Sequence, residues 1–428
     1  MKLNYKRTFF VGLAFMSICT FWQVYESIIP LILKETFGVS DTFSGVVMAL
    51  DNVLALFMLP LFGTISDKTR TKIGRRMPFI IGGTLCSCVF TILIPVGDNL
   101  RSFPLFMTAL ILVLLSMSTY RSPAVALMPD VTIKPLRSKA NAVINLMGTV
   151  GGILSLGAVA LLVPAGDNPN YIPVFVAVIV IMLACLAVLL ITINEPKLAK
   201  LAAEESKKLG IDVDTKDDSN SGDRKMSSGE KCSLIFLLAS VFLWFFGYNA
   251  ITTAFSKYAR IYWGLEGGLF AYALIVAQAA ALIAFIPVGI FASKFGRKRI
   301  ILIGITLLTI SFASGALFKE FSPIVLALFA MAGIGWASIN VNSYPMVVEM
   351  SKGSNVGKYT GFYYTFSMLS QVLTPIFSGF LMQHVGYHIL FPYGAVFAAL
   401  SFLTMLMVRH GDSKPDRIKG IEAFDSDD

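Results

Sequence analysis

Twelve long apolar runs follow one another along this chain of 428 residues, with short polar or charged segments between them. Each run holds about 20 residues, and an α-helix of that length can cross the hydrocarbon core of a bilayer. We therefore expect an all-α integral membrane protein with twelve transmembrane helices. The expected helices lie at approximately 9–33, 43–65, 77–96, 103–128, 140–164, 172–193, 233–256, 268–292, 300–318, 322–348, 358–382 and 387–408.

The composition and the placement of the charges support the same interpretation. Hydrophobic residues make up 56% of the chain and charged residues only 14%, whereas soluble domains contain about 25% charged residues. The net charge is +9, but most of the 35 Lys and Arg residues lie at the two ends and in the loops on one side of the predicted membrane. Positive loops mark the cytoplasmic side. We therefore expect cytoplasmic termini, a multi-pass protein of the cell membrane and no nucleic-acid partner.

The polar segment after the sixth apolar run divides the chain into two parts. Its composition, rich in Lys, Glu, Asp and Ser, predicts a solvated tether with a short amphipathic helix near 196–209 and a disordered centre at 212–229. The expected divisions are an N-terminal six-helix half at 1–193, a cytoplasmic linker at 194–232, a C-terminal six-helix half at 233–408 and a cytoplasmic tail at 409–428.

A basic loop occurs at the same place in both halves, between the second and third helices. In the first half it is Gly63–Phe79, GTISDKTRTKIGRRMPF, and in the second half it is Gly289–Arg299, GIFASKFGRKR. In both, a glycine near the end of an apolar helix is followed by a short run of Lys and Arg and then by the next helix. We infer that the chain contains one half-protein twice.

The layout and the two loops resemble those of the major facilitator superfamily, whose halves are built from helical repeats. Gly289, Gly296 and Arg297 resemble the compact loop found across that superfamily. In the first loop, Asp67 and Gly74 are farther apart than the matching positions of this compact loop. This longer spacing, followed by two arginines, resembles the sucrose-type sugar:proton symporters and the glycoside–pentoside–hexuronide:cation symporters. The resemblance implies a secondary active transporter that imports a sugar or glycoside by alternating access.

A second similarity lies at the end of the fourth predicted helix. Pro123, Ala126, Leu127 and Asp130 resemble a P-x-x-A-L-x-x-D pattern of the sucrose-carrier branch. This similarity supports the same group of carriers as the first loop.

The chain also departs from these relatives at specific positions. Plant sucrose carriers have a basic residue where this chain has Val125, although Arg121 lies one helical turn earlier. Melibiose-type sodium symporters carry paired aspartates in the second helix, where this chain has Ala55 and Leu59. We therefore expect a proton rather than sodium as the coupling ion, and no cofactor.

Charged residues at the cytoplasmic helix ends form a candidate gate. Asp130 and Glu349 occupy matching places after the fourth and tenth helices. Charge pairs there can hold one of two conformations and separate in the other, and simple anchoring of the loops is the alternative. The candidate gate residues are Gly63, Asp67, Gly74, Arg75, Arg76, Asp130, Gly289, Gly296, Arg297 and Glu349.

Three ionisable residues, Glu26, Asp51 and Arg121, lie inside apolar helices. Such residues are costly in lipid, so they tend to face a cavity and mark a transport path. The helical rise places both carboxyls about 10–12 Å below the outer surface and the arginine about 12 Å from the inner one. We expect Asp51 to carry the coupled proton and Glu26 to bind sugar or carry a second proton. A static ion pair, or a polar residue near the outer vestibule, is the alternative.

Polar and aromatic side chains on several helices complete a candidate substrate cavity, because sugar sites combine hydrogen-bonding groups with aromatic rings. Asn340 occupies the place in the tenth helix that Arg121 occupies in the fourth. Helix packing is the alternative for each aromatic residue. The candidate cavity residues are Trp22, Gln23, Tyr25, Tyr120, Trp244, Tyr248, Asn249, Gln278, Trp336, Asn340, Tyr344 and Gln371.

The sequence contains no sign of catalysis. It has no phosphate-binding glycine loop that ends in Lys and Ser or Thr, no nucleophile and base at a suitable spacing, and no Cys and His cluster suited to a metal. We therefore expect a monomeric membrane transporter for a small molecule rather than an enzyme. The alternatives are an exporter of drugs or other amphiphiles and, from another class, a non-transporting sensor or a lipid-handling membrane protein.

Overall fold

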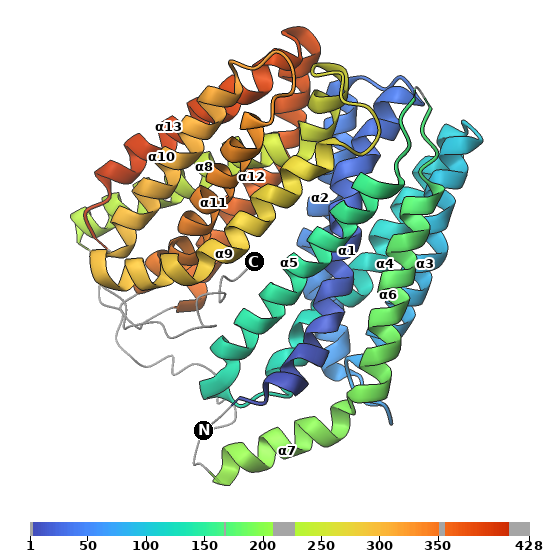
Figure 1. Ribbon diagram of the computed structural model, residues 1–428. Helices are drawn as coiled ribbons and strands as arrows, with labels where there is room; N and C mark the ends of the chain where they lie inside the picture. The colour runs from blue at the N-terminus through green and yellow to red at the C-terminus, as the bar shows by residue number, and fades with distance from the viewer. Residues whose placement is uncertain (1–2, 167, 209–226, 351–355, 411–428) are drawn as a thin grey trace. The chain divides into compact units, whose positions relative to one another are not determined.

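The computed structural model describes residues 3–166, 168–208, 227–350 and 356–410, which form helices joined by short loops (Figure 1). Among these residues, twelve helices are long and apolar enough to cross a membrane, so the predicted all-α fold with twelve spans is confirmed. The first six are α1 (Tyr5–Glu35), α2 (Asp41–Lys68), α3 (Met77–Asn99), α4 (Phe103–Asp130), α5 (Arg137–Leu162) and α6 (Ile172–Thr192). The other six are α8 (Ser228–Ile261), α9 (Phe270–Phe295), α10 (Arg297–Gly315), α11 (Ile324–Glu349), α12 (Val356–His384) and α13 (Leu390–Met407).

Several helices extend beyond the apolar runs that predicted them. For example, α8 begins at Ser228 rather than near residue 233. Ser227 and Glu230 form a capping box, in which the Ser227 hydroxyl accepts from the Glu230 N–H at 3.2 Å and the Glu230 carboxylate accepts from the Ser227 N–H at 2.9 Å. These bonds satisfy donors at the helix start that have no intrahelical partner, so the helix continues into polar sequence.

One more α-helix, α7 (Glu195–Lys208), lies between the sixth and the seventh spans. It confirms the short helix predicted near 196–209. Asn194 starts it, because its side-chain oxygen accepts from the Lys197 N–H at 3.1 Å. The predicted disordered centre of the linker lies almost entirely outside the described residues, and so does the predicted tail beyond His410.

The chain folds into two compact units. Unit 1 comprises Met1–Tyr25, Glu35–Phe37 and Asp51–Asp218, and unit 2 comprises Glu26–Lys34, Gly38–Leu50 and Ser219–Asp428. The end of α1 and the start of α2 therefore belong to unit 2. The division into halves at the linker stays a prediction.

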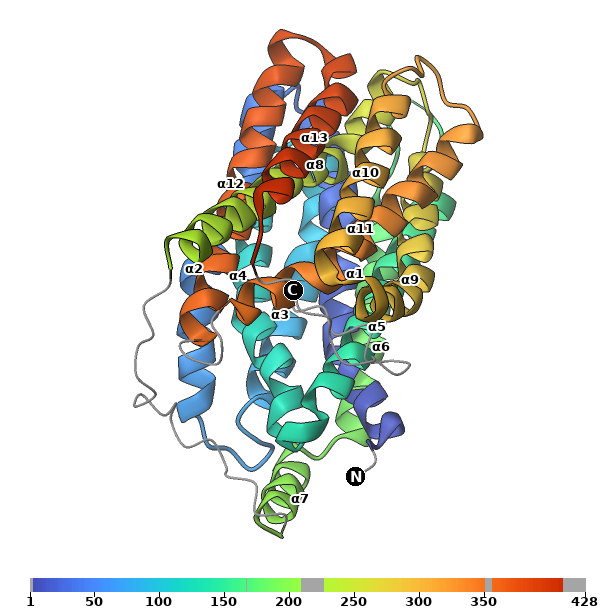
Figure 2. The ribbon, with the colours of Figure 1, turned by 90° about the vertical axis from the view of Figure 1, so that its left-hand side faces the viewer.

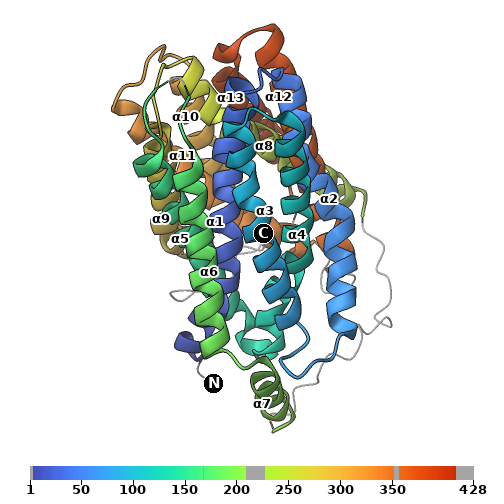
Figure 3. The same cartoon turned by 90° about the vertical axis from the view of Figure 1, so that its right-hand side faces the viewer.

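In unit 1, α3 packs against α4 and α6 (Figure 3). The contact with α4 is close because Gly83 leaves room: a Cβ there would lie 2.6 Å from the Tyr120 Cβ. Gly148 and Gly151 have the same effect between α5 and α1, where a Cβ would lie 2.6 Å from Phe15 and 2.5 Å from the Met16 carbonyl oxygen. Small residues of this kind allow helices to approach closely in membranes.

Unit 2 repeats the helix pairing of unit 1. Here α10 packs against α11 and α13, as α3 packs against α4 and α6, and α8 packs against α12 and α13 (Figure 2). Gly304 and Gly335 bring α10 and α11 together, since a Cβ on Gly304 would lie 2.6 Å from the Gly335 carbonyl oxygen. The shared pairing agrees with the repeat inferred from the two basic loops.

Candidate functional site

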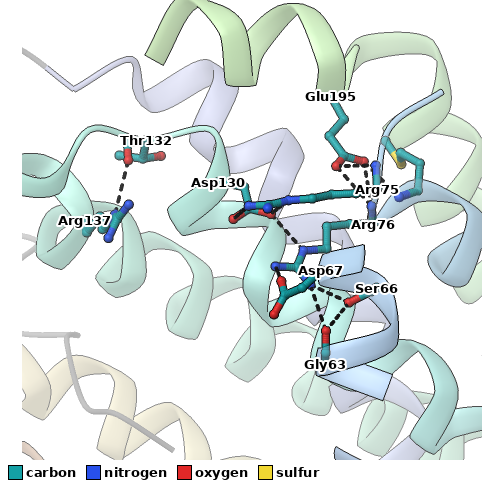
Figure 4. A network of polar contacts seen from close by, with 10 residues as sticks. Gly63, Ser66, Asp67, Arg75, Arg76, Asp130, Thr132, Arg137 and Glu195 are labelled. Atoms are coloured by element: carbon teal, nitrogen blue, oxygen red, sulfur yellow. Dashed lines mark hydrogen bonds and ion pairs between the residues drawn. The ribbon is translucent and has the colours of Figure 1, made fainter. Parts of the chain in front are cut away.

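The loop between α2 and α3 is held in place by a buried arginine, Arg76 (Figure 4). Its side chain is only 5% exposed, and its Nε donates to Asp130 Oδ2 at 2.8 Å. Its terminal nitrogens donate to the side chains of Asp67 and Ser66. One buried cation thus joins the end of α2 to the end of α4. We call the end of unit 1 that carries this loop the basic end, and the following five residues the basic-loop network: Asp67, Arg75, Arg76, Asp130 and Glu195.

Asp130 accepts hydrogen bonds from a second arginine as well. Arg75 Nε donates to Asp130 Oδ2 at 2.9 Å, and a terminal nitrogen of Arg75 donates to Oδ1. Because the carboxylate accepts these bonds, it raises the pKa of the Arg75 guanidinium above its ordinary value. The predicted charge contacts at this end of the helices are therefore present in unit 1.

Glu195, the first residue of α7, caps the start of α3. Its carboxylate accepts from the backbone N–H groups of Arg75 at 2.9 Å, Arg76 at 3.0 Å and Met77 at 2.9 Å. The first N–H groups of a helix lack intrahelical partners and carry a partial positive charge, so a carboxylate there is stabilised in two ways. Glu195 is only 2% exposed. It therefore ties α7 to the loop between α2 and α3.

Gly74 makes this cap possible. Its φ of 120° is a conformation that favours glycine. A Cβ at this position would also lie 2.1 Å from Glu195 Oε2. The glycine that ends the long spacing from Asp67 is thus needed for the turn that surrounds the Glu195 carboxylate with amides.

Glu195 was not predicted as a site residue, because it lies in the expected linker. The available signal was its position directly after an apolar run, in Asn194–Glu195–Pro196, which is typical of a helix start.

Unit 2 contains a smaller version of this arrangement. Arg297, in the first turn of α10, pairs with Glu349 at the end of α11. Gly296 precedes it with φ of 92°, and Gly289 is buried in the last third of α9. Gly63, the corresponding glycine of unit 1, offers its carbonyl oxygen to Arg76 at 3.5 Å. Asp130 and Glu349, matched by sequence position, therefore each bind an arginine in their own unit.

A second buried charged cluster lies in unit 2 and was not predicted. Asp41, the first residue of α2, is 2% exposed and accepts from three side chains. Its Oδ1 accepts from Lys257 Nζ at 2.9 Å and from the Tyr387 hydroxyl at 2.8 Å, and its Oδ2 accepts from Lys34 Nζ at 2.9 Å. We call these four residues the Asp41 cluster. The seventh span was expected to end at residue 256, which would leave Lys257 in a loop, but α8 continues to Ile261.

Backbone contacts hold the start of α2 against α12 beside this cluster. A Cβ on Gly45 would lie 2.0 Å from the Pro375 carbonyl oxygen, and one on Gly379 would lie 2.3 Å from the Asp41 carbonyl oxygen. Thr42 adds a hydrogen bond from its hydroxyl to the Gln383 side chain at 2.6 Å. The cluster therefore lies in a closely packed region of unit 2.

Two of the three predicted intramembrane charges lie in unit 1. Asp51 accepts from the Asn52 side chain at 2.8 Å, and Arg121 places its guanidinium 5.5 Å from the centre of the Trp22 ring. Neither Asp51 nor Arg121 forms an ion pair within the described part of the chain, so the static pair considered above is absent there. Glu26 belongs to unit 2, and its grouping with the other two stays a prediction.

Trp22 combines an aromatic face with an unused hydrogen-bond donor. Its Nε1 is buried and has no hydrogen-bond partner among the described residues. Gln23 follows it on α1, while Tyr25 and Tyr120 are fully buried and Tyr120 contacts the Ser17 hydroxyl at 3.3 Å. The two tyrosines thus take part in helix packing, and Trp22 with Arg121 provides polar groups that a ligand could bind.

The predicted cavity residues of unit 2 include an aromatic stack. Tyr248 of α8 and Trp336 of α11 are parallel, with ring centres 3.9 Å apart and an interplanar angle of 5°. Next to Tyr248, Asn249 has a buried Nδ2 without a partner among the described residues. The remaining predicted residues lie on four helices: Trp244 on α8, Gln278 on α9, Asn340 and Tyr344 on α11, and Gln371 on α12.

Not all of these residues are available to a ligand. Trp244 and Asn340 are buried, and the Tyr344 hydroxyl contacts Thr360 at 3.2 Å. The Tyr248 and Trp336 pair with Asn249 is therefore the part of the predicted set in unit 2 that most resembles a sugar-binding surface, since it joins a flat apolar face to an amide.

We predict that Glu195→Ala lowers the free energy of unfolding by about 2–4 kcal/mol, because it leaves buried amides at the start of α3 without an acceptor. Thermal unfolding of the purified protein measures this change. Glu204→Ala is the matched control, since Glu204 is exposed on the same helix. Equal melting temperatures for the two variants would contradict the capping role.

Comparison with known proteins places this arrangement in a family. The sequence profile of the Major Facilitator Superfamily matches residues 11–286 and 237–424. Sucrose transport protein SUC3 of Arabidopsis thaliana is 30% identical over 143 residues, and sucrose transport protein SUT4 of Oryza sativa subsp. indica is 25% identical over 143 residues. Both alignments cover 29% of this chain and 24% of the relative, so the match spans about a quarter of the length of these relatives.

Solved structures show the same fold at low identity. The nucleoside transporter NupG matches with a TM-score of 0.68 and 15% identity, covering 95% of this chain and 100% of that one. The inward-open xylose transporter XylE from E. coli matches with a TM-score of 0.63 and 15% identity, covering 93% and 94%. Because the profile covers nearly the whole chain and the twelve-helix fold is shared with known transporters, the chain belongs to the major facilitator superfamily of membrane transporters, which are not enzymes.

Proposed function

We propose that this protein imports a sugar or glycoside together with a proton across the cell membrane, by alternating access. The observation that carries this proposal is the pair formed by Trp22 and Arg121 in the interior of unit 1. It presents an aromatic ring, a guanidinium and a buried indole N–H without a partner among the described residues. A sugar hydroxyl can accept from that N–H, and leaving a buried donor unpaired is costly. The segment similar to sucrose transport proteins supports the same substrate class.

Asp51 is the proposed proton carrier. It lies inside α2, a membrane span, and within the described chain its carboxylate accepts a hydrogen bond from a neutral amide and forms no ion pair. A carboxyl without a fixed counter-charge can exist in both protonation states at lower cost than one held in an ion pair. Its place in α2 therefore suits a group that takes up and releases a proton during transport.

The two charge clusters are the proposed gates. The basic-loop network closes helix ends at the cytoplasmic side, and the Asp41 cluster closes helix ends at the opposite side. Asp41 begins α2 and Asp67 lies in its last turn. Each cluster holds one conformation, and its ion pairs must separate before that end can open.

We predict that Trp22→Phe raises the KM for the transported sugar roughly fivefold, as expected for one lost hydrogen bond. The maximal rate should change little, since the aromatic face beside Arg121 remains. Uptake of a panel of radiolabelled sugars and glycosides into proteoliposomes measures both values. Trp263→Phe is the control, because its indole N–H already donates to the Phe318 carbonyl oxygen at 3.0 Å.

The same panel separates the proposed import from drug export. Efflux of a lipophilic cation without uptake of any sugar would overturn the sugar assignment.

We predict that Asp51→Asn abolishes accumulation of sugar driven by a proton gradient while exchange of labelled for unlabelled sugar continues. The amide cannot carry a proton, but the binding groups around Trp22 are unchanged. Glu26→Gln, tested in parallel, shows whether the second carboxyl contributes. An Asp51→Asn protein that still accumulates sugar against its gradient would exclude Asp51 as the carrier.

We predict that Asp41→Asn opens the region around the Asp41 cluster, because the neutral amide leaves the charge of buried Lys257 without an opposite charge. Labelling of a cysteine at the fully buried Ser44 position by a membrane-impermeant maleimide should accelerate at least about tenfold. The double variant Asp41→Asn and Lys257→Met should label slowly again, since it removes the unpaired charge. Equal rates in the natural, single and double variants would contradict the gate.

A further inference from the structure

A groove of about 430 Å³ opens at the basic end of unit 1, between the start of α1 and the junction of α6 with α7. It lies outside the regions assigned above to substrate, proton and gates. Figure 1 shows α7 beyond the ends of the spans at this end of unit 1, and Figure 3 shows it nearly along its axis, to one side of the end of α6. The residues that line the groove are Asn4, Lys6, Arg7, Phe10, Thr192, Ile193 and Leu198.

Two cations of the groove have no acidic partner in the described part of the chain. Lys6 is exposed and Arg7 is half-buried, and neither side chain forms an ion pair with a described residue. Lys197 and Lys200, both exposed on α7, add positive charge nearby. In the basic-loop network, by contrast, Arg75 and Arg76 bind carboxylates. The groove therefore presents positive charge that is available to an outside anion.

The wall of the groove is apolar and continues into the helix interior. Phe10 packs against the core formed by Leu13, Met16, Met147 and Cys185. On the other side, Ile193 is buried and Leu198 is half-buried. Both α1 and α6 are membrane spans, so the groove lies where these helices leave the hydrocarbon core. Since α7 begins directly after α6 ends, its start lies close to the level of the lipid headgroups.

We propose that this groove binds an anionic phospholipid, with its phosphate between Lys6 and Arg7 and its acyl chains along Phe10, Ile193 and Leu198. Free phosphate would use only the cations and leave the apolar wall in water. A neutral phospholipid would use the wall but leave uncompensated positive charge. Basic groups between helices at the membrane surface are suited to anionic headgroups, and an anionic phospholipid matches both features of the groove at once.

The experiment uses the purified full chain in detergent, titrated with dioleoylphosphatidylglycerol or dioleoylphosphatidylcholine. Native mass spectrometry counts the retained lipid, and thermal unfolding reports stabilisation. Because each basic side chain near an anionic surface raises affinity roughly fivefold, the double variant Lys6→Gln and Arg7→Gln should bind the anionic lipid roughly 25-fold more weakly. The control variant Lys68→Gln and Arg70→Gln removes the same charge from the same end, outside the groove. It should bind normally.

Three results would overturn the proposal. The natural protein could retain both lipids equally, which would remove the role of the charge. The control variant could lose as much affinity as the groove variant, which would indicate general attraction rather than a site. Inorganic phosphate could stabilise the natural protein as well as the anionic lipid does, which would indicate a free-anion site. Each result is independent of sugar transport.

Discussion

The buried guanidinium of Arg76 is the interaction on which the basic end of unit 1 depends. It takes its acceptors from α2 and α4, while the amide of the same residue is capped by Glu195 at the start of α7. A buried charge that loses a partner costs about 3–5 kcal/mol, so these helix ends cannot move apart independently. Gly74 adopts a backbone conformation that favours glycine, and this conformation places the backbone amides around the Glu195 carboxylate.

Three aspartates on α2 differ in their surroundings, and the roles that we propose for them differ accordingly. Asp41, at the start of the helix, accepts from two lysines and a tyrosine. Asp67, in the last turn, binds Arg76. Asp51, between them, accepts a hydrogen bond from the Asn52 side chain and forms no ion pair within the described chain. The outer two are held by opposite charge, which is the basis of their proposed role as gates. The middle one forms no ion pair, which is the basis of its proposed role as proton carrier.

Much of the fold and part of the candidate site could be predicted from the sequence. The twelve spans, the short helix at the start of the linker and the matching positions of Asp130 and Glu349 at charged helix ends follow from apolar length, charge and internal repetition, although the partner of each carboxylate does not. The cap formed by Glu195 and the cluster around Asp41 could not be found in this way. Their partners are 120 residues away for the Arg75 amide and 216 residues away for Lys257. No local pattern links groups at such separations.

The sequence by itself determined that the chain crosses a membrane twelve times, that it contains an internal repeat and that it resembles a transporter family. The spans depend on local hydropathy, because each one must satisfy its own backbone and match the thickness of the bilayer. The repeat and the resemblance also depend on short motifs of glycine and charged residues, which are local as well. Only the tertiary structure decided which charges meet, as in the pairs of Asp41 with Lys257 and Arg76 with Asp130. An ion pair requires two atoms to lie about 3 Å apart, and that distance depends on how whole helices pack.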